Sequence, residues 1–430
     1  MSPDREKIIK NIFSKDRNKR REAVKKFKEF DKIDETLINY LILMLEDNDS
    51  GVVDAAYNAL VDIDSELVIK KLVNLISTRN IKLRSYAFEI LNQKGKKATN
   101  DLLTKLKSEN ADTRKFALDV LGEVGTSEYE TDIAVLLKDE DPNVRYAAAE
   151  ALGKIGTSKS AYKLLEQLKK EKEIWVKYVI IDSLSKIGNE KIAEQLIKLP
   201  LSGDSYTFES IIETISKIAD KSVIQQMLNI LPMVSEYEKL KIIDAIFNLI
   251  KKYGENILLK IKIDSDIVDI LKALLKKEIE NKHYVIILLS YFVNSEDYFL
   301  FLPFLESDNE DEKVAAILAL KRVQNPDSVK YLLKIFEYNN TYVKLNIIET
   351  LNKFEDSSIY EKFISCINDE TETVKISICK LLTKYYNYEV KKLFKNLLKE
   401  HRNDPEFIKN LKKIILETDK SFFGNNKRRK

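Results

Sequence analysis

Apolar residues in the segment 144–155 recur at steps of three and four residues, which places them on one face of a helix. The acidic segment DEDPN precedes this helix, and residues 129–138 predict a partner helix before it. Asp141 is placed to cap the second helix, and Pro142 fits its first turn. We expect Gly156 to end that helix in the left-handed conformation that glycine favours. The pattern therefore predicts a pair of helices joined by an acidic turn.

One apolar position of this helical pair, which we call the anchor, returns along almost the whole chain. Successive anchors are 31, 30, 31, 32, 31, 31, 43, 31, 31 and 31 residues apart, and such a fixed period is typical of stacked repeats. Each repeat in such an array packs only on its neighbours. We therefore expect an all-α fold over residues 1–420, a single α-solenoid (superhelix) of stacked helix-turn-helix repeats with a period of about 31 residues. The anchors are Leu60, Leu91, Leu121, Leu152, Leu184, Ile215, Ile246, Leu289, Leu320, Leu351 and Leu382.

Two segments depart from the period. The step from Ile246 to Leu289 contains 12 extra residues, so we expect a longer or irregular repeat around residues 251–282. It is either an ordinary loop insertion or a hinge or protrusion that contacts a partner. Residues 421–430 are basic and have no apolar period, which predicts a disordered tail.

Residues 141–156 have the pattern D-x-x-V-R-x-x-A-x-x-A-L-G-x-I-G, which resembles the HEAT repeat in the short form named after the phycobilisome lyases. Residues 112–125 repeat this pattern closely and residues 174–188 repeat it more loosely. The resemblance implies eleven to thirteen helical pairs over essentially the whole chain, with the second helices lining a concave face. Weaker copies stand at 52–60, 82–91, 313–320, 343–351 and 374–382.

A row of basic residues stands seven residues before the anchor in most repeats. In HEAT proteins an Asp and an Arg at these matching positions bridge adjacent repeats, so the resemblance implies a structural ladder. Asp139, Glu171 and Asp369 are acids at the matching positions. The alternative is a cationic stripe for phosphate, but Val53 and Phe208 interrupt the row. The ladder candidates are Arg84, Arg114, Arg145, Lys177, Lys313, Lys344 and Lys375, and Lys239 and Lys282 share the position.

A second row, of acidic residues, stands two residues before the anchor. Repeat stacking would align these carboxylates along the layer of second helices, where they would form an acidic groove for a basic peptide or protein. The alternative is a solvated face, because Lys154, Lys186 and Lys217 each stand four residues after one of the acids. The candidate partner-binding residues are Glu89, Asp119, Glu150, Asp182, Glu213 and Asp244, with Glu349 at the same position later in the chain.

Trp175 is the single tryptophan of the chain and stands at the start of a second helix. Tryptophan is over-represented among residues that dominate protein interfaces, so Trp175 joins the candidate partner-binding residues. Burial between repeats is the alternative.

Composition supports the helical prediction and limits the possible chemistry. Hydrophobic residues make up 44% of the chain, with only 10 Gly and 7 Pro, which favours helix over an all-β fold. Cys366 and Cys379 lie on apolar helical segments and cannot supply a disulfide framework or a four-ligand zinc site, so we expect a cytoplasmic protein. We expect no membrane span, because no apolar run reaches about 18 residues without charge.

The net charge of +3 conceals an uneven distribution. Residues 1–30 carry 11 basic and 5 acidic side chains, and residues 376–430 carry 15 and 6, which leaves 46 basic against 58 acidic side chains between them. Such polarity favours oriented association with charged partners.

No enzyme motif is present. The sequence lacks a phosphate-binding G-x-x-x-x-G-K-[ST] loop, a G-x-S-x-G elbow and a G-x-G-x-x-G fingerprint, and His283 and His401 are too few and too far apart in sequence to suggest a metal centre. We therefore expect no enzyme activity, no cofactor and no metal. The acidic run at 306–312 is explained by helix capping rather than by calcium binding.

These patterns favour a non-enzymatic scaffold or regulatory adaptor that binds a protein partner, one with a basic segment, along the concave face. The alternative is nucleic-acid binding through the basic ends, Arg17–Lys28 and Lys391–Lys430. The oligomeric state is left open.

Overall fold

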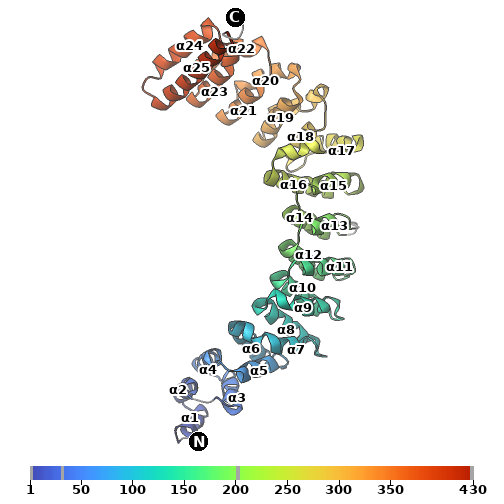
Figure 1. The fold of residues 1–430 in the computed structure, drawn as a ribbon, viewed down its shortest axis with the longest axis vertical. Helices are drawn as coiled ribbons and strands as arrows, with labels where there is room; N and C mark the ends of the chain where they lie inside the picture. The colour runs from blue at the N-terminus through green and yellow to red at the C-terminus, as the bar shows by residue number, and fades with distance from the viewer. Residues whose placement is uncertain (1–2, 31–32, 200–203, 427–430) are drawn as a thin grey trace. The chain divides into compact units, whose positions relative to one another are not determined.

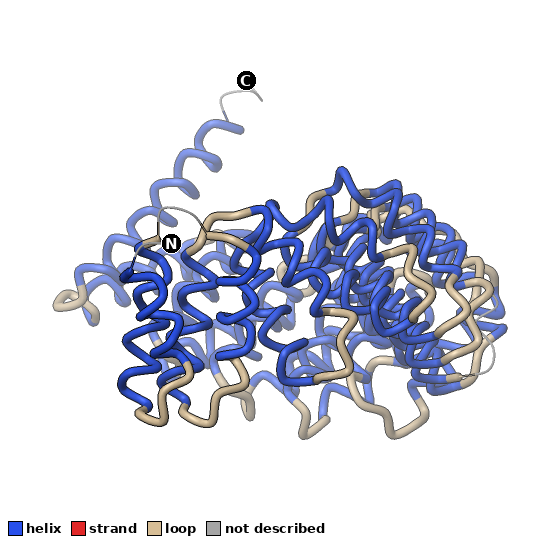
Figure 2. The backbone as a smooth tube through the Cα atoms, turned by 90° about the horizontal axis from the view of Figure 1, so that it is seen from below, coloured by secondary structure: helices blue, strands red, loops and turns tan. Residues whose placement is uncertain are grey.

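A computed structural model describes residues 3–30, 33–199 and 204–426. These residues form helices, turns and loops with no strand, so the protein is an all-α solenoid of stacked helices, as the period predicted (Figure 2). The chain divides into two compact units, residues 1–223 and 224–430, and each is described by itself.

The first unit consists of two layers of helices in which each helix packs on its counterpart in the next repeat (Figure 1). A short helix, α1 (Pro3–Ile12), packs on the first member of the second-helix layer. The first-helix layer contains α3 (Glu35–Met44), α5 (Glu66–Leu75), α7 (Thr99–Lys105), α9 (Glu130–Val135), α11 (Ser158–Leu168) and α13 (Glu190–Leu196). The second-helix layer contains α2 (Arg17–Lys25), α4 (Ser50–Asp62), α6 (Ile81–Lys94), α8 (Ala111–Val124), α10 (Pro142–Ile155), α12 (Ile174–Ile187) and α14 (Ser205–Ile218).

The second unit repeats this arrangement with more 3₁₀ turns. Between α18 and α19, η7 (Ser295–Leu300) and η8 (Leu302–Glu306) take the place of a first helix. Its other first helices are α15 (Val223–Asn229), α17 (Ser265–Leu275), α20 (Val329–Phe336), α22 (Ser357–Cys366) and α24 (Tyr388–Glu400). Its second helices are α16 (Glu236–Tyr253), α18 (Lys282–Ser290), α19 (Glu310–Val323), α21 (Thr341–Leu351), α23 (Glu372–Leu382) and α25 (Pro405–Asn426).

The anchor positions form the centre of the core. Every anchor from Leu60 to Leu382 is 0% exposed. The 31-residue period of the sequence is therefore the period at which side chains enter the core. Burying one leucine or isoleucine side chain contributes roughly 1.5–3 kcal/mol to the stability of the fold.

The ends of the second helix at residues 142–155 confirm two predictions and correct one. Asp141 accepts a hydrogen bond from the backbone N–H of Asn143 at 2.7 Å, and Pro142 lies in the first turn of α10. The prediction for Gly156 was wrong, because its φ of −74° and ψ of 168° are extended rather than left-handed. Glycine leaves space there instead, since a Cβ added without any shift would lie 2.4 Å from the carbonyl oxygen of Leu152.

The predicted first helix of this repeat is also more broken than expected. It consists of η3 (Ser127–Tyr129), α9 and η4 (Leu136–Lys138), so only six of its residues are α-helical. The first helix of this repeat thus ends in a 3₁₀ turn, η4, that packs on both α10 and α11.

The longer repeat contains an additional 3₁₀ segment. Gly254, with a φ of 84°, ends α16, and η6 (Glu255–Lys260) follows before α17 begins at Ser265. The extra residues therefore form ordered structure rather than a plain loop. At the C-terminal end α25 runs to Asn426, so the segment predicted to be disordered is helical over residues 421–426, whereas residues 427–430 lie outside the described residues.

Candidate functional site

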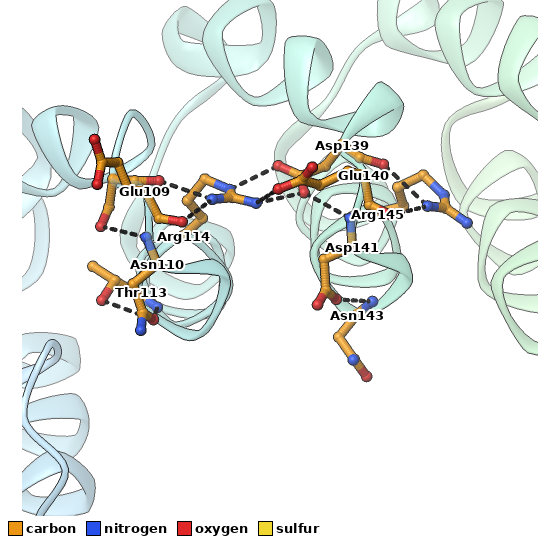
Figure 3. A network of polar contacts seen from close by, with 10 residues as sticks. Glu109, Asn110, Thr113, Arg114, Asp139, Glu140, Asp141, Asn143 and Arg145 are labelled. Carbon is orange, nitrogen blue, oxygen red and sulfur yellow. Dashed lines mark hydrogen bonds and ion pairs between the residues drawn. The ribbon is translucent and has the colours of Figure 1, made fainter.

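Two arginines of the predicted ladder bind carboxylates of the following repeat. Figure 3 shows the first of these contacts, between Arg114 and Asp139. The Nε and Nη2 atoms of Arg114 each donate to Asp139 at 2.7 Å, and Nη1 donates to the carbonyl oxygens of Ser108 and Glu109 at 2.8 and 3.0 Å. The paired side chains are only 9% and 6% exposed. Such a two-pronged contact fixes one inter-helix turn against the next.

Arg145 makes the same set of contacts one repeat later. It donates to both oxygens of Glu171 at 2.8 and 2.9 Å, and Nη1 donates to the carbonyl oxygens of Asp139 and Glu140. Burial alone would raise the pKa of Glu171, but hydrogen bonds from Arg145, Gln167 and the backbone lower this pKa to about 2. Glu171 is therefore a buried, fully ionised carboxylate, and both guanidinium groups direct their donors at protein atoms rather than at a ligand.

Two further members of the basic row contact an aromatic ring or a carboxylate of the next repeat. The Arg84 guanidinium lies 4.2 Å from the centroid of the Phe116 ring and 3.9 Å from Asp112. Lys344 donates to Glu370 at 2.6 Å, not to the expected Asp369, which lies in the 3₁₀ turn η10 (Ile367–Asp369).

The remaining members contact several kinds of group. Lys313 donates to Asn339 at 2.9 Å, and Nζ of Lys375 lies 3.4 Å from Nε2 of His401. Lys239 donates to the carbonyl oxygen of Val234 at 3.0 Å, and Lys282 donates to Glu278 at 3.4 Å. For Lys177, the residue 26 positions later is residue 203, which lies outside the described part of the chain.

Sequence reasoning missed one contact of this kind at the N-terminal end. Arg20 donates to both oxygens of Asp47 at 2.8 Å and to the carbonyl oxygen of Ser14 at 2.9 Å. Arg20 stands seven residues before Phe27, which is 0% exposed like the anchors. The spacing to an apolar residue was thus available as a signal, but the step of 33 residues from Phe27 to Leu60 is longer than the common period.

The acidic row lies on the outward side of the second helices, and we call the outward-facing side chains of α6, α8, α10, α12 and α14 the second-helix surface. Four carboxylates of the row face a lysine four residues away on the same helix, which makes each pair nearly neutral. The distances are 2.7 Å for Lys115–Asp119, 3.0 Å for Lys154–Glu150, 2.6 Å for Lys186–Asp182 and 2.8 Å for Lys217–Glu213.

The other members of the row differ from these four. Glu89 is exposed on α6, whereas Asp244 lies in the second unit and accepts a hydrogen bond from Asn281 at 3.3 Å. Burial raises the pKa of Asp119 and of Asp244, and the Lys115 ammonium opposes this effect at Asp119. The surface is therefore a stripe of paired opposite charges rather than a purely acidic groove.

Aromatic side chains lie beside this stripe, at the N-terminal ends of the second helices. Trp175 is 40% exposed and packs on Tyr146 with a distance of 5.6 Å between ring centroids. Tyr206 follows exactly one repeat after Trp175 and is 72% exposed, and the Tyr178 hydroxyl donates to Asp204 at 3.3 Å. We call Tyr146, Trp175, Tyr178 and Tyr206 the aromatic row.

Sequence reasoning singled out Trp175 but missed its partners. Trp175 and Tyr206 both stand nine residues before an anchor, so the 31-residue spacing was a usable signal. On α12, Asp182 lies seven residues after Trp175, which is two turns along the same side of the helix, or about 10 Å. The aromatic row and the charge-paired stripe therefore run side by side across consecutive repeats.

The described residues contain no cluster of three or more His, Cys, Asp or Glu side chains that could hold a metal ion. The two histidines lie apart in the fold, since His283 is on α18 and the His401 ring stacks on Phe407 at 4.1 Å. Cys379 is buried, and burial raises the pKa of its thiol to about 12. Nor does any helix in this part of the chain combine the length and apolar character needed to cross a membrane.

Comparison with known proteins finds one family and several structures. Residues 99–185 match the family model for HEAT repeats. A crystal structure of importin beta is similar over 96% of this chain and 71% of its own, with 13% identity and a TM-score of 0.43. A structure of Kap95p with RanGDP is similar over 97% of this chain and 66% of its own, with 12% identity and a TM-score of 0.46.

An engineered protein is similar over 81% of this chain and 98% of its own, with 18% identity and a TM-score of 0.33. A search of curated protein sequences gives no match. The residues that match the family model include the two arginine contacts on α8 and α10, and helical pairs of the same kind continue on both sides of them. Residues 99–185 are thus HEAT repeats, and they lie within a longer stack of helical pairs.

Proposed function

We propose that this protein is a non-enzymatic scaffold or regulatory adaptor that binds a protein partner on the second-helix surface of residues 1–223. The observation that carries the proposal is the aromatic row, in which Trp175 and Tyr206 are exposed at the same place in consecutive repeats. Exposed tryptophan and tyrosine side chains supply large contact areas at low entropic cost and are enriched at protein interfaces. Core packing does not account for these two side chains.

The spacing of the repeats favours an extended partner segment. Packed helices lie about 8–10 Å apart, and a polyproline II segment advances about 3.1 Å per residue with three residues per turn. A segment of this conformation that crosses the second-helix surface would therefore present every third side chain to the next helix. We therefore expect the partner segment to contact the aromatic row with side chains that stand three residues apart in its sequence.

Basic side chains suit both parts of this surface. Cations are attracted to the faces of tryptophan and tyrosine rings. They can also replace the lysines that now pair with Glu150, Asp182 and Glu213. Because each of these carboxylates is already paired with a lysine, the acidic row would contribute to the selectivity and orientation of binding more than to its affinity. Glu89 and Asp119 extend the same row on α6 and α8, whereas Asp244 belongs to the second unit and is considered by itself.

The test compares two double variants of the full chain in affinity purification from a lysate, with nuclease treatment in parallel. Trp175→Ala with Tyr206→Ala should remove a protein partner that survives nuclease. The matched control is Tyr338→Ala with Tyr388→Ala, because each of these tyrosines is 84% exposed in the second unit. Retention of every protein partner by the first variant, or equal loss from both variants, would contradict the proposal.

The rival function, nucleic-acid binding by Arg17–Lys28 and Lys391–Lys430, remains a prediction. Part of the second segment lies outside the described residues. Recovery of nucleic acid with an affinity that falls steeply with salt, and that is unchanged in the Trp175 and Tyr206 variant, would favour the rival.

A further inference from the structure

A cavity of about 410 Å³ opens between α9 and α11 in the first-helix layer, on the opposite layer from the aromatic row. Its wall includes Ala134 and Val135 of α9, and Val135 is 69% exposed. α9 has only six α-helical residues whereas α11 has eleven, and the cavity is lined by side chains of both helices and by Lys138 of η4. Its volume falls within the range of about 300–1,000 Å³ that is usual for ligand pockets.

Three lysines surround this apolar wall. Lys138, Lys159 and Lys163 all line the cavity and are all exposed, and the described residues offer none of them an ion pair. Like charges brought together without counter-charges repel one another, and an anionic group between them relieves the repulsion.

The one acid that lines the cavity, Glu130, offsets only one of these three positive charges. Glu130 is buried and accepts hydrogen bonds from the backbone N–H of Thr157 at 2.9 Å and from the Ser160 hydroxyl at 2.7 Å. These bonds overcome the effect of burial, which alone would raise the pKa of Glu130, and the net pKa is lowered. Its oxygens are thus already committed to α11, and the cavity presents a net positive rim over an apolar wall.

We infer that this cavity, which we call the lysine-rimmed groove, is a second docking site that takes an acidic peptide segment anchored by an apolar side chain. The apolar wall favours a side chain such as leucine over a free phosphate, and the three ammonium groups favour glutamate or aspartate around it. No aromatic side chain lines the groove, which disfavours a nucleotide base. A site for acidic segments on one layer and an aromatic row on the other would allow the protein to hold two partners at once.

The test measures fluorescence anisotropy of a labelled peptide in which pairs of leucine alternate with pairs of glutamate, titrated with the full chain at low ionic strength. Lys138→Glu, Lys159→Glu and Lys163→Glu together should weaken binding at least about tenfold. The matched control, Lys170→Glu with Lys191→Glu and Lys198→Glu, changes the net charge equally at exposed lysines of the same unit and should leave binding unchanged within about twofold. Failure of the peptide to bind the wild type, or an equal loss in both triple variants, would overturn the inference.

A second readout places the peptide in the groove and does not depend on the triple variant. A dye on Val135→Cys, in a Cys366→Ser background, should change its emission when the acidic peptide is added. The same dye on Ile81→Cys, a residue that is 70% exposed on α6, should not respond. A response at Ile81 alone, or no response at Val135 under saturating peptide, would exclude the groove. These variants do not change the aromatic row. The result therefore does not bear on the proposed function, which is tested separately with the Trp175 and Tyr206 variant.

Discussion

Arg145 and Glu171 face each other through two hydrogen bonds of 2.8 and 2.9 Å, across the junction between two helical repeats. Their side chains are 15% and 1% exposed, so the pair is nearly removed from water. Breaking a buried ion pair by removing one partner leaves an uncompensated charge, which costs about 3–5 kcal/mol. The pair is therefore expected to control how firmly adjacent repeats hold together.

Glu171→Gln should lower the free energy of unfolding by about 3 kcal/mol at neutral pH. The folded-state pKa of Glu171 is lowered from 4.5 to about 2, so its contribution is present above pH 4.5 and is lost as the pH falls toward 2. Urea unfolding of wild type and variant should show a difference that is largest near pH 7 and that narrows below pH 4.5. Glu173→Gln, which changes an exposed neighbour, is the control and should have little effect at any pH. A difference in unfolding free energy that is constant between pH 7 and pH 3 would contradict the lowered pKa of Glu171.

Arg114→Lys should destabilise the protein by about 2 kcal/mol, because lysine cannot make the two-pronged contact with Asp139 or reach the carbonyl oxygens of Ser108 and Glu109. Arg84→Lys is the matched comparison, since Arg84 lies 3.9 Å from its carboxylate and should cost less than about 1 kcal/mol. Thermal unfolding monitored by circular dichroism measures both. Equal midpoints for the two variants would show that the contact at Asp139 contributes nothing beyond a surface charge.

Gly156→Ala should be destabilising by about 1–3 kcal/mol, although the backbone conformation suits any residue. The added Cβ would lie 2.4 Å from the carbonyl oxygen of Leu152 and 2.9 Å from Cβ of Ser160, so α10 and α11 would have to separate. In contrast, Gly51→Ala meets only flexible side chains, with Asp49 nearest at 3.1 Å, and should be close to neutral. If denaturant midpoints show Gly156→Ala to be neutral as well, close packing does not explain this glycine.

The sequence was sufficient for the fold because the core period appears directly in its apolar pattern. Each anchor is completely buried, so the same apolar position recurs at every repeat. The sequence could not show why residue 156 is a glycine. Glycine suits both a left-handed helix end and an extended helix end with little space for a side chain, and only the neighbouring atoms distinguish the two cases. The ladder acid of one repeat was also misplaced by one residue, because the sequence singled out Asp369, which lies in the 3₁₀ turn η10, whereas Lys344 contacts Glu370, the residue that follows this turn.

The candidate site was only partly predictable. Charge spacing along each helix correctly gave the pairs that Lys154, Lys186 and Lys217 form with the acidic row. The lysine-rimmed groove could not be predicted, since it depends on how α9 divides into α-helical and 3₁₀ parts. The position of such a groove depends on the geometry of the turns, which the apolar period of the sequence does not predict.

The longer repeat is held by one network that spans three elements of the second unit. Arg322 of α19 donates to Glu255 of η6 at 2.7 Å and to the Tyr291 hydroxyl oxygen at 2.8 Å, and its guanidinium lies 3.7 Å from the Tyr291 ring centroid. Tyr291 in turn donates to Glu255 at 2.7 Å. Burial and this hydrogen bond raise the pKa of Tyr291, so its hydroxyl stays protonated and acts as a donor.

Arg322→Met should therefore free η6 without unfolding the repeats on either side. Hydrogen exchange should become at least about tenfold faster for the amides of residues 255–260, because their local opening loses the network's stabilisation, while the amides of α21 keep their protection. Tyr291→Phe removes one hydrogen bond but keeps the ring under the guanidinium, so its effect should be smaller. If Arg322→Met accelerates exchange equally in η6 and α21, the network supports the whole unit rather than the inserted segment. Unchanged exchange in η6 would mean that packing of the buried Leu258 alone holds the segment in place.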